Sequence, residues 1–336
     1  MGKGSAGDPQ VSVIIPVRNA AASIGLQLEA LLRQSAAPRF EVIVVDNRST
    51  DGTVVAAESW RSLFAASERV DLRLVSAPAF AGAAYARNVG IRYARGDKLL
   101  FCDGDDCVGP YWVSHSAELL ERCEVFSGSA LPLADDAFPH KVEDVWNWLD
   151  DKRQVPMLAD GQAHDTFPVL MGGCFGIRKA FMLELGGFDH SMGSAGEDNE
   201  FALRIRASGR PILGTEDAKV AYRTRTSRRA IFRSSRAAGV AHALNAERYG
   251  LWAESVIVGR GHWLTGFARA CLAAVRMLLT SGERDHQGLS GRLGVTLGAL
   301  EGGIRYRLLR RIPAPQVGLG MAGEFECELG ESGEAV

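Results

Sequence analysis

The first hundred residues alternate between short apolar runs and segments of helical periodicity, and this alternation most limits the folds open to the chain. Apolar runs typical of buried strands cover Val11–Pro16, Glu41–Asp46, Asp71–Val75 and Lys98–Cys102. Between them, apolar residues at helical spacing predict helices that begin after Ser23 and that cover residues 53–64 and 82–94. This order of strands and helices implies an α/β fold with a mainly parallel sheet and helices on both faces.

The patterns become less regular after residue 106. Residues 110–122 are expected to form a helix and residues 125–129 a short strand. The stretch 131–165 has scattered Pro, Asp and Trp, and we expect it to be irregular. Residues 166–178 have an extended apolar pattern, and residues 197–207 have a helical one.

These patterns divide the chain into four expected parts. Residues 1–9 are small and polar and are expected to be flexible, and residues 10–226 form the α/β domain. Residues 227–311 are predicted to be helical and are rich in arginine. Residues 312–336 contain five Glu and no Lys or Arg, with almost no apolar pattern, so we expect a disordered acidic tail.

Composition excludes several classes of protein. The net charge of −2 argues against a nucleic-acid binder, and no Cys-x-x-Cys pair or Cys/His spacing resembles a zinc site. No apolar run reaches the length of about 18 residues that a spanning helix requires. The start lacks a signal-peptide pattern, so a cytoplasmic protein is expected. The helical region with Arg269 and Arg276 on one face leaves open a peripheral position at the inner face of the cell membrane.

The acidic cluster Asp103-Gly104-Asp105-Asp106 directly follows the fourth predicted strand. Open α/β sheets place their ligands at the carboxyl ends of strands. Two carboxylates one residue apart can hold a divalent metal such as Mg or Mn, and that metal can bind a diphosphate. We therefore predict Asp103 and Asp105 as the metal-binding pair, with Asp106 capping a helix or holding a loop; a solvated acidic loop is the alternative.

Three other stretches have residue types suited to a nucleotide or to proton transfer. Asp46 ends a predicted strand, where a carboxylate can accept hydrogen bonds from a base or ribose, whereas the following Asp51 is equally suited to a turn. Arg87 is a cation that can bind a phosphate or a base carbonyl, or form a surface ion pair. Glu197 and Asp198 begin a predicted helix. They are either acidic residues that the helix dipole favours at an N-terminus, or they supply a general base.

A run of six arginines continues into the helical region, at positions 223, 225, 228, 229, 233 and 236. Their spacing places several of them on one side of a helix. The run is consistent with a solvated face, with contacts to a phosphate-bearing acceptor, or with contacts to anionic lipid head groups.

Taken together, four stretches resemble the family-2 glycosyltransferases of the GT-A (Rossmann-like) fold. The matching stretches are residues 11–21, 42–53, 82–106 and 172–209, in the order that the family has. The resemblance covers roughly residues 10–250. It implies a nucleotide diphosphate sugar as donor, UDP by default, with a divalent metal and inversion at the anomeric carbon. Residues 10–226 would then be the catalytic domain, and residues 227–311 would lie on the acceptor or membrane-surface side.

The resemblance also implies roles for individual residues. Asp198 would be the catalytic base, with Glu197 beside it, and Asp103 and Asp105 would be the Asp-x-Asp metal motif. The expected nucleotide-sugar contacts are Pro16, Val17, Asn19, Asp46, Arg87, Asp103, Gly172 and Gly173. The acceptor is expected to be a glycan, a lipid-linked glycan or a small molecule, and the sequence indicates no oligomeric state.

One departure from the family concerns the metal site. Many members have a His soon after the strand that follows the base helix, whereas residues 220–225 of this chain read Val-Ala-Tyr-Arg-Thr-Arg. Either fewer protein ligands hold the metal, or an arginine supplies positive charge to the leaving diphosphate. Two other functions compatible with the motifs are a haloacid-dehalogenase-like phosphatase, with Asp103 as nucleophile, and a non-catalytic nucleotide-binding module.

Overall fold

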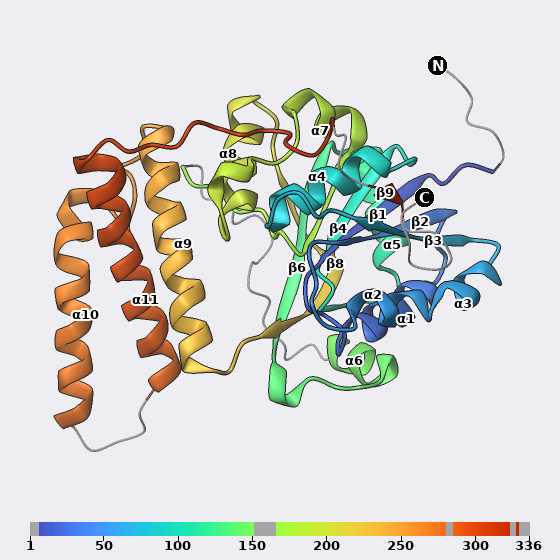
Figure 1. The fold of residues 1–336 in the computed structure, drawn as a ribbon, viewed down its shortest axis with the longest axis horizontal. Helices are drawn as coiled ribbons and strands as arrows, with labels where there is room; N and C mark the ends of the chain where they lie inside the picture. Colours follow the sequence, from blue (N-terminus) through green and yellow to red (C-terminus); the bar gives the residue numbers. More distant parts are fainter. Residues whose placement is uncertain (1–6, 151–165, 280–284, 323–326, 329–336) are drawn as a thin grey trace.

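A mixed β-sheet flanked by helices forms the body of the protein, and three long helices stand beside it (Figure 1). The computed structural model describes residues 7–150, 166–279, 285–322 and 327–328 of the chain. Within these residues the strand order is β5-β8-β6-β7-β4-β1-β2-β3-β9. The strands are β1 (Val11–Val17), β2 (Phe40–Asp46), β3 (Val70–Ser76), β4 (Lys98–Cys102), β5 (Cys107–Val108), β6 (Val125–Ala134), β7 (Cys174–Arg178), β8 (Leu213–Thr224) and β9 (Cys327–Glu328).

The helices cover both faces of the sheet and continue into the C-terminal region. They are α1 (Ile24–Leu32), α2 (Thr53–Glu58), α3 (Arg61–Ala65), α4 (Ala83–Tyr93), α5 (Trp112–Arg122), α6 (Val142–Leu149), α7 (Lys179–Leu185), α8 (Glu197–Ala207), α9 (Arg228–Arg248), α10 (His262–Leu279) and α11 (His286–Gly302). Short helical turns lie at Asp135–Ala137, His190–Met192, Gly259–Gly261 and Gly303–Leu308.

Strands β3, β2, β1 and β4 are parallel, and the predicted α/β fold with a mixed, mainly parallel sheet is confirmed. All five residues of β4 are buried, which explains why this strand reads as an unbroken apolar run. The next strand across the sheet, β7, is antiparallel to β4. As a result, the segment that precedes β7 lies beside the end of β4, where the acidic cluster begins.

Successive residues of β1 contribute to two separate cores, because side chains alternate between the faces of a sheet. Val13 and Ile15 belong to the core on the side of α1 and α5, whereas Ile14 belongs to the core on the side of α4 and α8. Two layers of helices are therefore fixed relative to one set of strands.

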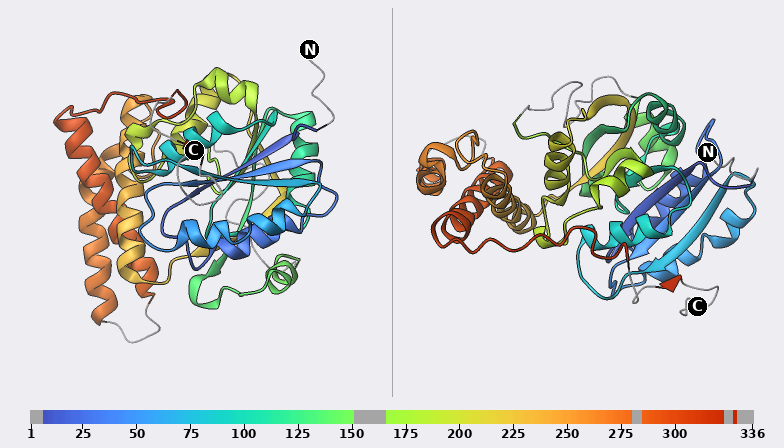
Figure 2. Two further views of the ribbon diagram at one scale, coloured as in Figure 1. Left: turned by 45° about the vertical axis from the view of Figure 1, so that its right-hand side comes forward. Right: turned by 90° about the horizontal axis from the view of Figure 1, so that it is seen from above.

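The three C-terminal helices lie side by side at one end of the molecule, with α9 next to α8 (Figure 2). Glycine is required where α11 crosses α9, because a Cβ on Gly298 would lie 2.1 Å from the main-chain oxygen of Arg236. Gly294 and Gly302 make similarly close approaches to α9. Across the described residues, none of the helices combines the length and the apolar character needed to cross a membrane.

Two sequence-based boundaries are wrong. The helix predicted over residues 53–64 is broken at Ser59 and Trp60 into α2 and α3. The stretch 131–165, expected to be irregular, contains the end of β6 and the helix α6, while residues 151–165 lie outside the described residues. The residue pattern alone does not predict strand β8, which only the resemblance implies before residues 220–225, because Glu216, Asp217 and Lys219 interrupt its apolar alternation.

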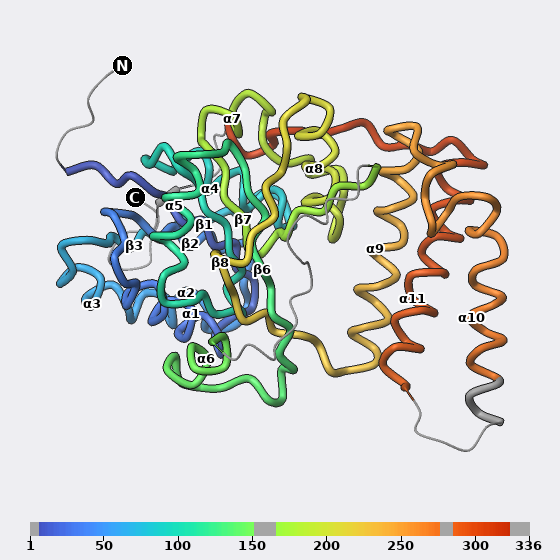
Figure 3. Tube along the Cα trace, turned by 180° about the vertical axis from the view of Figure 1, so that it is seen from behind, coloured from blue at the N-terminus to red at the C-terminus, as the bar shows by residue number. Residues whose placement is uncertain are grey.

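The expected disordered tail is wrong for residues 312–322, which run across the body past α8 and α7 (Figure 3). The main-chain oxygen of Leu319 accepts a hydrogen bond from Asn88 Nδ2 at 3.0 Å, and Gln316 N donates to Asp189 Oδ1 at 2.8 Å. Buried polar side chains of the body hold this segment through hydrogen bonds. The prediction is based on apolar periodicity within the tail, which does not reveal such contacts. Residues 327 and 328 pair with β3, and the rest of the predicted tail lies outside the described residues, as do residues 1–6 of the predicted flexible N-terminus.

Candidate active site

The acidic cluster leaves the end of β4 on a loop that a buried glutamine holds in place. Gln27 of α1 donates through Nε2 to the main-chain oxygen of Asp103 at 3.2 Å and accepts from Val108 N at 3.0 Å. A Cβ on Gly104 would lie 2.6 Å from Val17, so the loop passes directly over the end of β1. Sequence reasoning missed Gln27, whose only signal is an amide on the apolar face of a helix.

The three carboxylates of the cluster differ in their surroundings. The Asp103 side chain is 31% exposed, whereas Asp106 is buried. Asp106 Oδ1 accepts from Arg223 N at 2.8 Å, which confirms that Asp106 holds a loop, but its buried Oδ2 has no partner. Burial, followed by repulsion from Asp103, raises the pKa of Asp105 and raises that of Asp106 well above its ordinary value.

These carboxylates suit a divalent cation. Mutual repulsion and an unpartnered buried oxygen are both relieved by positive charge, and carboxylate oxygens are the ligands that Mg²⁺ and Mn²⁺ prefer. Over the described ranges, no group of three or more His, Cys, Asp or Glu side chains is placed to hold a metal ion. By their chemistry, the carboxylates of Asp103 and Asp105 and the unpartnered Oδ2 of Asp106 are the groups that fit such an ion.

A pocket of about 260 Å³ opens beside Asp103 and Asp105 and is bordered by the end of β8. Arg223 is bound within its wall: Nε donates to the main-chain oxygen of Asp105 at 2.8 Å, and Nη1 pairs with Asp135 at 2.9 Å. Arg225 is exposed at the pocket and forms no hydrogen bond or ion pair with a described residue. It lies where the family pattern leads one to look for a metal-binding His.

Arg87 joins the acidic cluster to the start of α8. Its buried guanidinium donates from Nη1 to Glu197 Oε1 at 2.7 Å. Nη2 reaches both Asp103 Oδ1 and the main-chain oxygen of Gly172, each at 3.2 Å. Residues from α4, the loop after β4, α8 and the segment before β7 are thus brought to one place, although they are far apart in sequence.

The two glycines before β7 are needed because carboxylates lie against them. A Cβ on Gly172 would lie 2.8 Å from Asp198 Oδ2, and a Cβ on Gly173 would lie 2.8 Å from Asp103 Oδ2. Asp198 and Asp103 therefore flank the same short stretch of backbone. Any larger residue at either position would displace one of these carboxylates.

Asp198 is half-buried in the first turn of α8, and its Oδ1 accepts a hydrogen bond from Asn199 N at 2.7 Å. Burial raises the pKa of Asp198 to about 6, with a further contribution from Glu197 that Arg87 partly offsets. A carboxyl with such a pKa is ionised at neutral pH yet basic enough to accept a proton.

The ends of β1 and β2 lie side by side, with Val17 in register with Asp46. Pro16 pairs with Val45 one position earlier. Asn19 adopts a left-handed backbone conformation (φ 56°) and accepts from Thr50 N at 2.8 Å, which ties the two loops together. Asp46 Oδ1 is buried without a partner. Asp51 Oδ1 accepts from Thr53 N at 3.0 Å, two residues further along, which is the contact of a turn residue.

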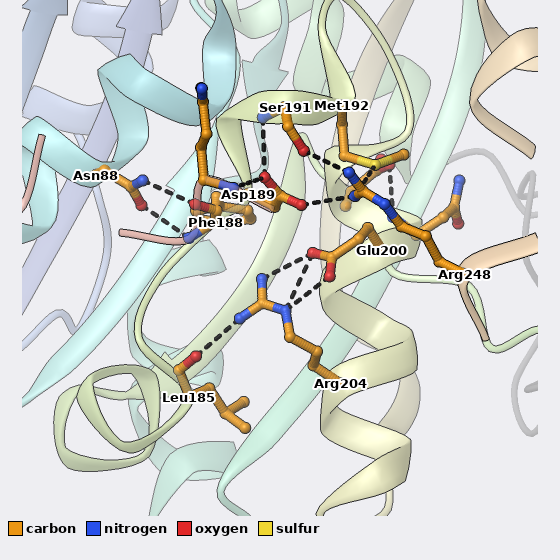
Figure 4. A network of polar contacts seen from close by, with 12 residues as sticks. Asn88, Leu185, Phe188, Asp189, Ser191, Met192, Glu200, Arg204 and Arg248 are labelled. Atoms are coloured by element: carbon orange, nitrogen blue, oxygen red, sulfur yellow. Dashed lines mark hydrogen bonds and ion pairs between the residues drawn. The ribbon is translucent and has the colours of Figure 1, made fainter. Parts of the chain in front are cut away.

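A polar network behind α8 fixes its orientation (Figure 4). Asn88 bonds both the N–H and the C=O of Phe188, at 2.8 and 2.9 Å. The buried Asp189 pairs with Arg248 of α9 at 2.8 Å, and Glu200 of α8 pairs with Arg204 at 2.8 Å. No sequence pattern connects Asn88 or Arg248 with this loop, because their partners are distant along the chain.

Comparison with known proteins identifies the family. The model of glycosyl transferase family 2 matches residues 12–185, and the chain belongs to this family. It is 27% identical over 245 residues to the O-antigen biosynthesis protein RfbC of Myxococcus xanthus, which covers 67% of this chain and 18% of RfbC. It is also 27% identical to an uncharacterised glycosyltransferase of Haemophilus influenzae, over 58% of this chain and 61% of that protein.

The chain spans between 18% and 61% of the length of these and the other curated relatives compared. Among solved structures, the fold is similar to that of the mannosyltransferase PcManGT from Pyrobaculum calidifontis in complex with GDP-Man and Mn²⁺. That match has a TM-score of 0.58 at 23% identity and covers 91% of this chain and 89% of PcManGT. TarS of S. aureus matches with a TM-score of 0.50 at 20% identity, over 77% of this chain and 45% of TarS. The GT-A fold class is thereby confirmed, and the phosphatase alternative is overturned by the family match.

Proposed function

We propose that the protein is an inverting glycosyltransferase that moves a sugar from a nucleotide diphosphate sugar to an acceptor hydroxyl. The observation that carries this proposal is the contact of one guanidinium, that of Arg87, with both Asp103 and Glu197. Because Asp198 lies against Gly172, the predicted metal-binding and proton-accepting carboxylates border one space. The Mn²⁺ and GDP-Man of PcManGT support a donor and a metal of this kind.

On the donor side, Asp103 and Asp105 would hold a Mg or Mn ion. When bound, such an ion neutralises the negative charge that develops on the leaving diphosphate. Pro16, Val17 and Asn19 would border the nucleotide. Asp46, with an unpartnered buried Oδ1, would accept a hydrogen bond from its base or ribose.

Arg87 acts in this proposal as a positioning residue. Each Nη atom contacts a protein oxygen, so the guanidinium fixes Asp103 and Glu197 relative to each other beside the proposed nucleotide site. Gly172 and Gly173 keep the backbone close enough for the donor sugar to lie between the two groups of carboxylates.

On the acceptor side, Asp198 takes the proton of the attacking hydroxyl as the new bond forms on the face opposite the diphosphate. Glu197 keeps Arg87 in place and raises the proton affinity of Asp198. The acceptor is a glycan, a lipid-linked glycan or a small molecule, and the protein acts in the cytoplasm, where the membrane surface would supply a lipid-linked one.

The test is a thermal-shift panel of UDP, GDP and other nucleoside diphosphates, each with Mn²⁺ and with a chelator. A ligand that binds the folded state raises the apparent melting temperature by mass action. We expect one diphosphate to give a metal-dependent shift that Asp103→Asn abolishes. The absence of any shift would contradict the proposal, and sugar transfer that persists unchanged in Asp198→Asn would refute the role of the base.

A further inference from the structure

A second pocket, of about 290 Å³, lies between α8, α9 and the segment just before Leu170. Its walls are mainly apolar and include Phe167, Val169, Leu203 and Ala238. Ligand pockets have volumes of about 300 Å³ and above, so this one is at the lower end of the range. It has room for a single ring-sized group. It shares no lining residue with the pocket beside Asp103.

Two segments connect this pocket to the proposed base. Gly196 and Asn199 line the pocket, and they flank Glu197 and Asp198 in the first turn of α8. On the opposite wall, Val169 precedes by three residues the glycine that lies against Asp198. The pocket therefore adjoins the first turn of α8, which carries the proposed base.

Asn245 of α9 supplies an unpaired acceptor to the pocket. It is 3% exposed, and its buried Oδ1 has no hydrogen-bond partner within the described part of the chain. Buried amide oxygens are nearly always paired, so one without a partner at a pocket wall indicates a ligand that donates a hydrogen bond.

His242, one turn earlier on α9, supplies a donor. Ser255 Oγ accepts from Ile257 N at 3.1 Å and from Val258 N at 3.0 Å, which uses both of its lone pairs. Its hydroxyl must then donate to His242 Nε2, 2.7 Å away, and the neutral ring carries its proton on Nδ1. That Nδ1 has no acceptor in the ranges that the structure describes. A hydroxyl group both donates and accepts, and so matches Asn245 and His242 together.

The pocket has no side chain of fixed charge in its lining, and burial lowers the pKa of His242 to about 4, which keeps the imidazole neutral at pH 7. A phosphate or carboxylate would lose its hydration there without gaining a counter-charge. The neighbouring pocket, beyond Ala241, differs in being lined by Arg233, Arg236 and Arg305.

We propose that the pocket between α8 and α9 binds the acceptor, and that the acceptor presents an uncharged, hydroxyl-bearing ring such as a neutral sugar. Such a ring has an apolar face for Phe167, which packs on His242 with 4.7 Å between ring centroids, and hydroxyls for the polar atoms of α9. The inference rests on the proposed function for its link to Asp198. Its α9 residues lie beyond residues 12–185, the part that the family model matches.

Saturation-transfer NMR on the full chain tests the inference, with methyl glucoside and methyl mannoside as neutral probes and glucuronic acid as a charged one, each with and without UDP. Ala238→Phe would fill the pocket, and Asn245→Leu would remove the unpaired acceptor. Ala237→Phe is the matched control, because the same substitution one residue earlier on α9 lies in the arginine-lined pocket instead. Melting curves verify that each variant folds. If Ala238→Phe does not fold, Asn245→Leu decides the test.

We expect signals from the neutral glycosides that are lost in Ala238→Phe, weakened in Asn245→Leu and kept in Ala237→Phe. The inference would be overturned if the neutral glycosides gave signals in Ala238→Phe equal to those in the unmutated protein. It would also be overturned by the absence of any signal from the neutral glycosides, or by a stronger signal from glucuronic acid than from them. Calorimetric titration of the unmutated protein with UDP and GDP is run in parallel. If neither nucleotide binds, the proposed function fails, whereas nucleotide binding without glycoside binding removes only the acceptor assignment.

Discussion

Asp198 combines a half-buried position with two charged neighbours of opposite sign, and this balance sets its expected pH dependence. A base whose pKa is raised to about 6 is protonated, and therefore inactive, below that pH. We expect kcat/KM for sugar transfer to rise with pH through about 6 and to level off above it. Measured pH–rate profiles provide the check, and a profile that is flat between pH 5 and 8 would rule out Asp198 as the titrating base.

Removing the carboxylate tests the same residue without relying on titration. Asp198→Asn is expected to lower kcat about 10²- to 10⁴-fold, the usual contribution of a general base, while the affinity for the nucleoside diphosphate stays near that of the unmutated protein. Steady-state kinetics and calorimetry measure the two effects separately. A large loss of nucleotide affinity would instead assign Asp198 to donor binding.

Arg225 has a positive charge that is free to act on a diphosphate. It lines the pocket of Asp103 and Asp105, and its charge opposes the rise in the pKa of Asp105. Because the side chain is exposed, we expect Arg225→Ala to weaken UDP or GDP binding by only about three- to tenfold. Binding of the uncharged nucleoside should not change.

The matched control for this prediction is Arg229→Ala, which removes an exposed arginine of α9 that is outside the pocket. Titrations with and without Mn²⁺ separate the contribution of the guanidinium from that of the metal. Equal effects of the two substitutions would show that Arg225 contributes only to the general positive charge of this surface.

Single residues were predictable from the sequence where a motif specified them. Asp103, Arg87 and Glu197 occur in stretches with a recognisable order, and the structure brings these three side chains into contact. Gln27 and Asn88 were not predictable, because one polar residue in a helix does not reveal which distant backbone groups it will pair with. The unpaired Oδ1 of Asn245 likewise becomes evident only from burial.

At the scale of elements, the loop between α7 and α8 depends on Asn88 of α4. This fully buried amide bonds Phe188 N, Phe188 O and Leu319 O, so it holds two segments at once. Asn88→Leu leaves Phe188 N and Leu319 O without partners, whereas Phe188 O keeps its bond from Gly318 N. We expect the substitution to lower the free energy of unfolding by about 2–4 kcal/mol. Urea denaturation measures the change.

Asn147→Leu is the matched control, because Asn147 is exposed on α6 and makes no such contacts. Its effect should be within about 0.5 kcal/mol. If the two variants unfold at the same urea concentration, the bonds of Asn88 do not stabilise the loop that precedes α8.

The elements differ in how strongly their own sequence specifies them. Strands β1, β2 and β4 are buried runs, and β3 has an alternating pattern. Helix α8 begins and ends where its periodicity does, so local pattern was sufficient for these elements. Strand β8 has only scattered buried positions, and it forms because β6 pairs with it along Ser129–Ala134. Pairing between distant strands is a tertiary contact that a local pattern does not contain.

Across the whole molecule, three distant parts of the chain converge behind the proposed base. Asp189 lies just before α8, Arg248 ends α9, and Gln316 belongs to the segment that follows α11. Arg248 bonds both Asp189 and the main-chain oxygen of Pro313, at 2.8 and 2.7 Å. The position of α8, and with it that of Asp198, therefore depends on residues outside the part of the chain that the family model matches.

Removing the C-terminal segment is the test at this scale. A chain that ends at Arg311 loses the bonds from residues 316 and 319 to Asp189 and Asn88, together with the packing of Leu319 and Met321 against the core. We expect its free energy of unfolding to fall by about 2–5 kcal/mol. We also expect faster hydrogen exchange in α8 and a lower kcat, since loosening α8 displaces Asp198.

The comparison is a chain that ends at residue 328, which keeps these contacts and should match the full chain in both measurements. Unchanged exchange in α8 after removal of residues 312–336 would mean that the C-terminal segment lies on the body without positioning the base.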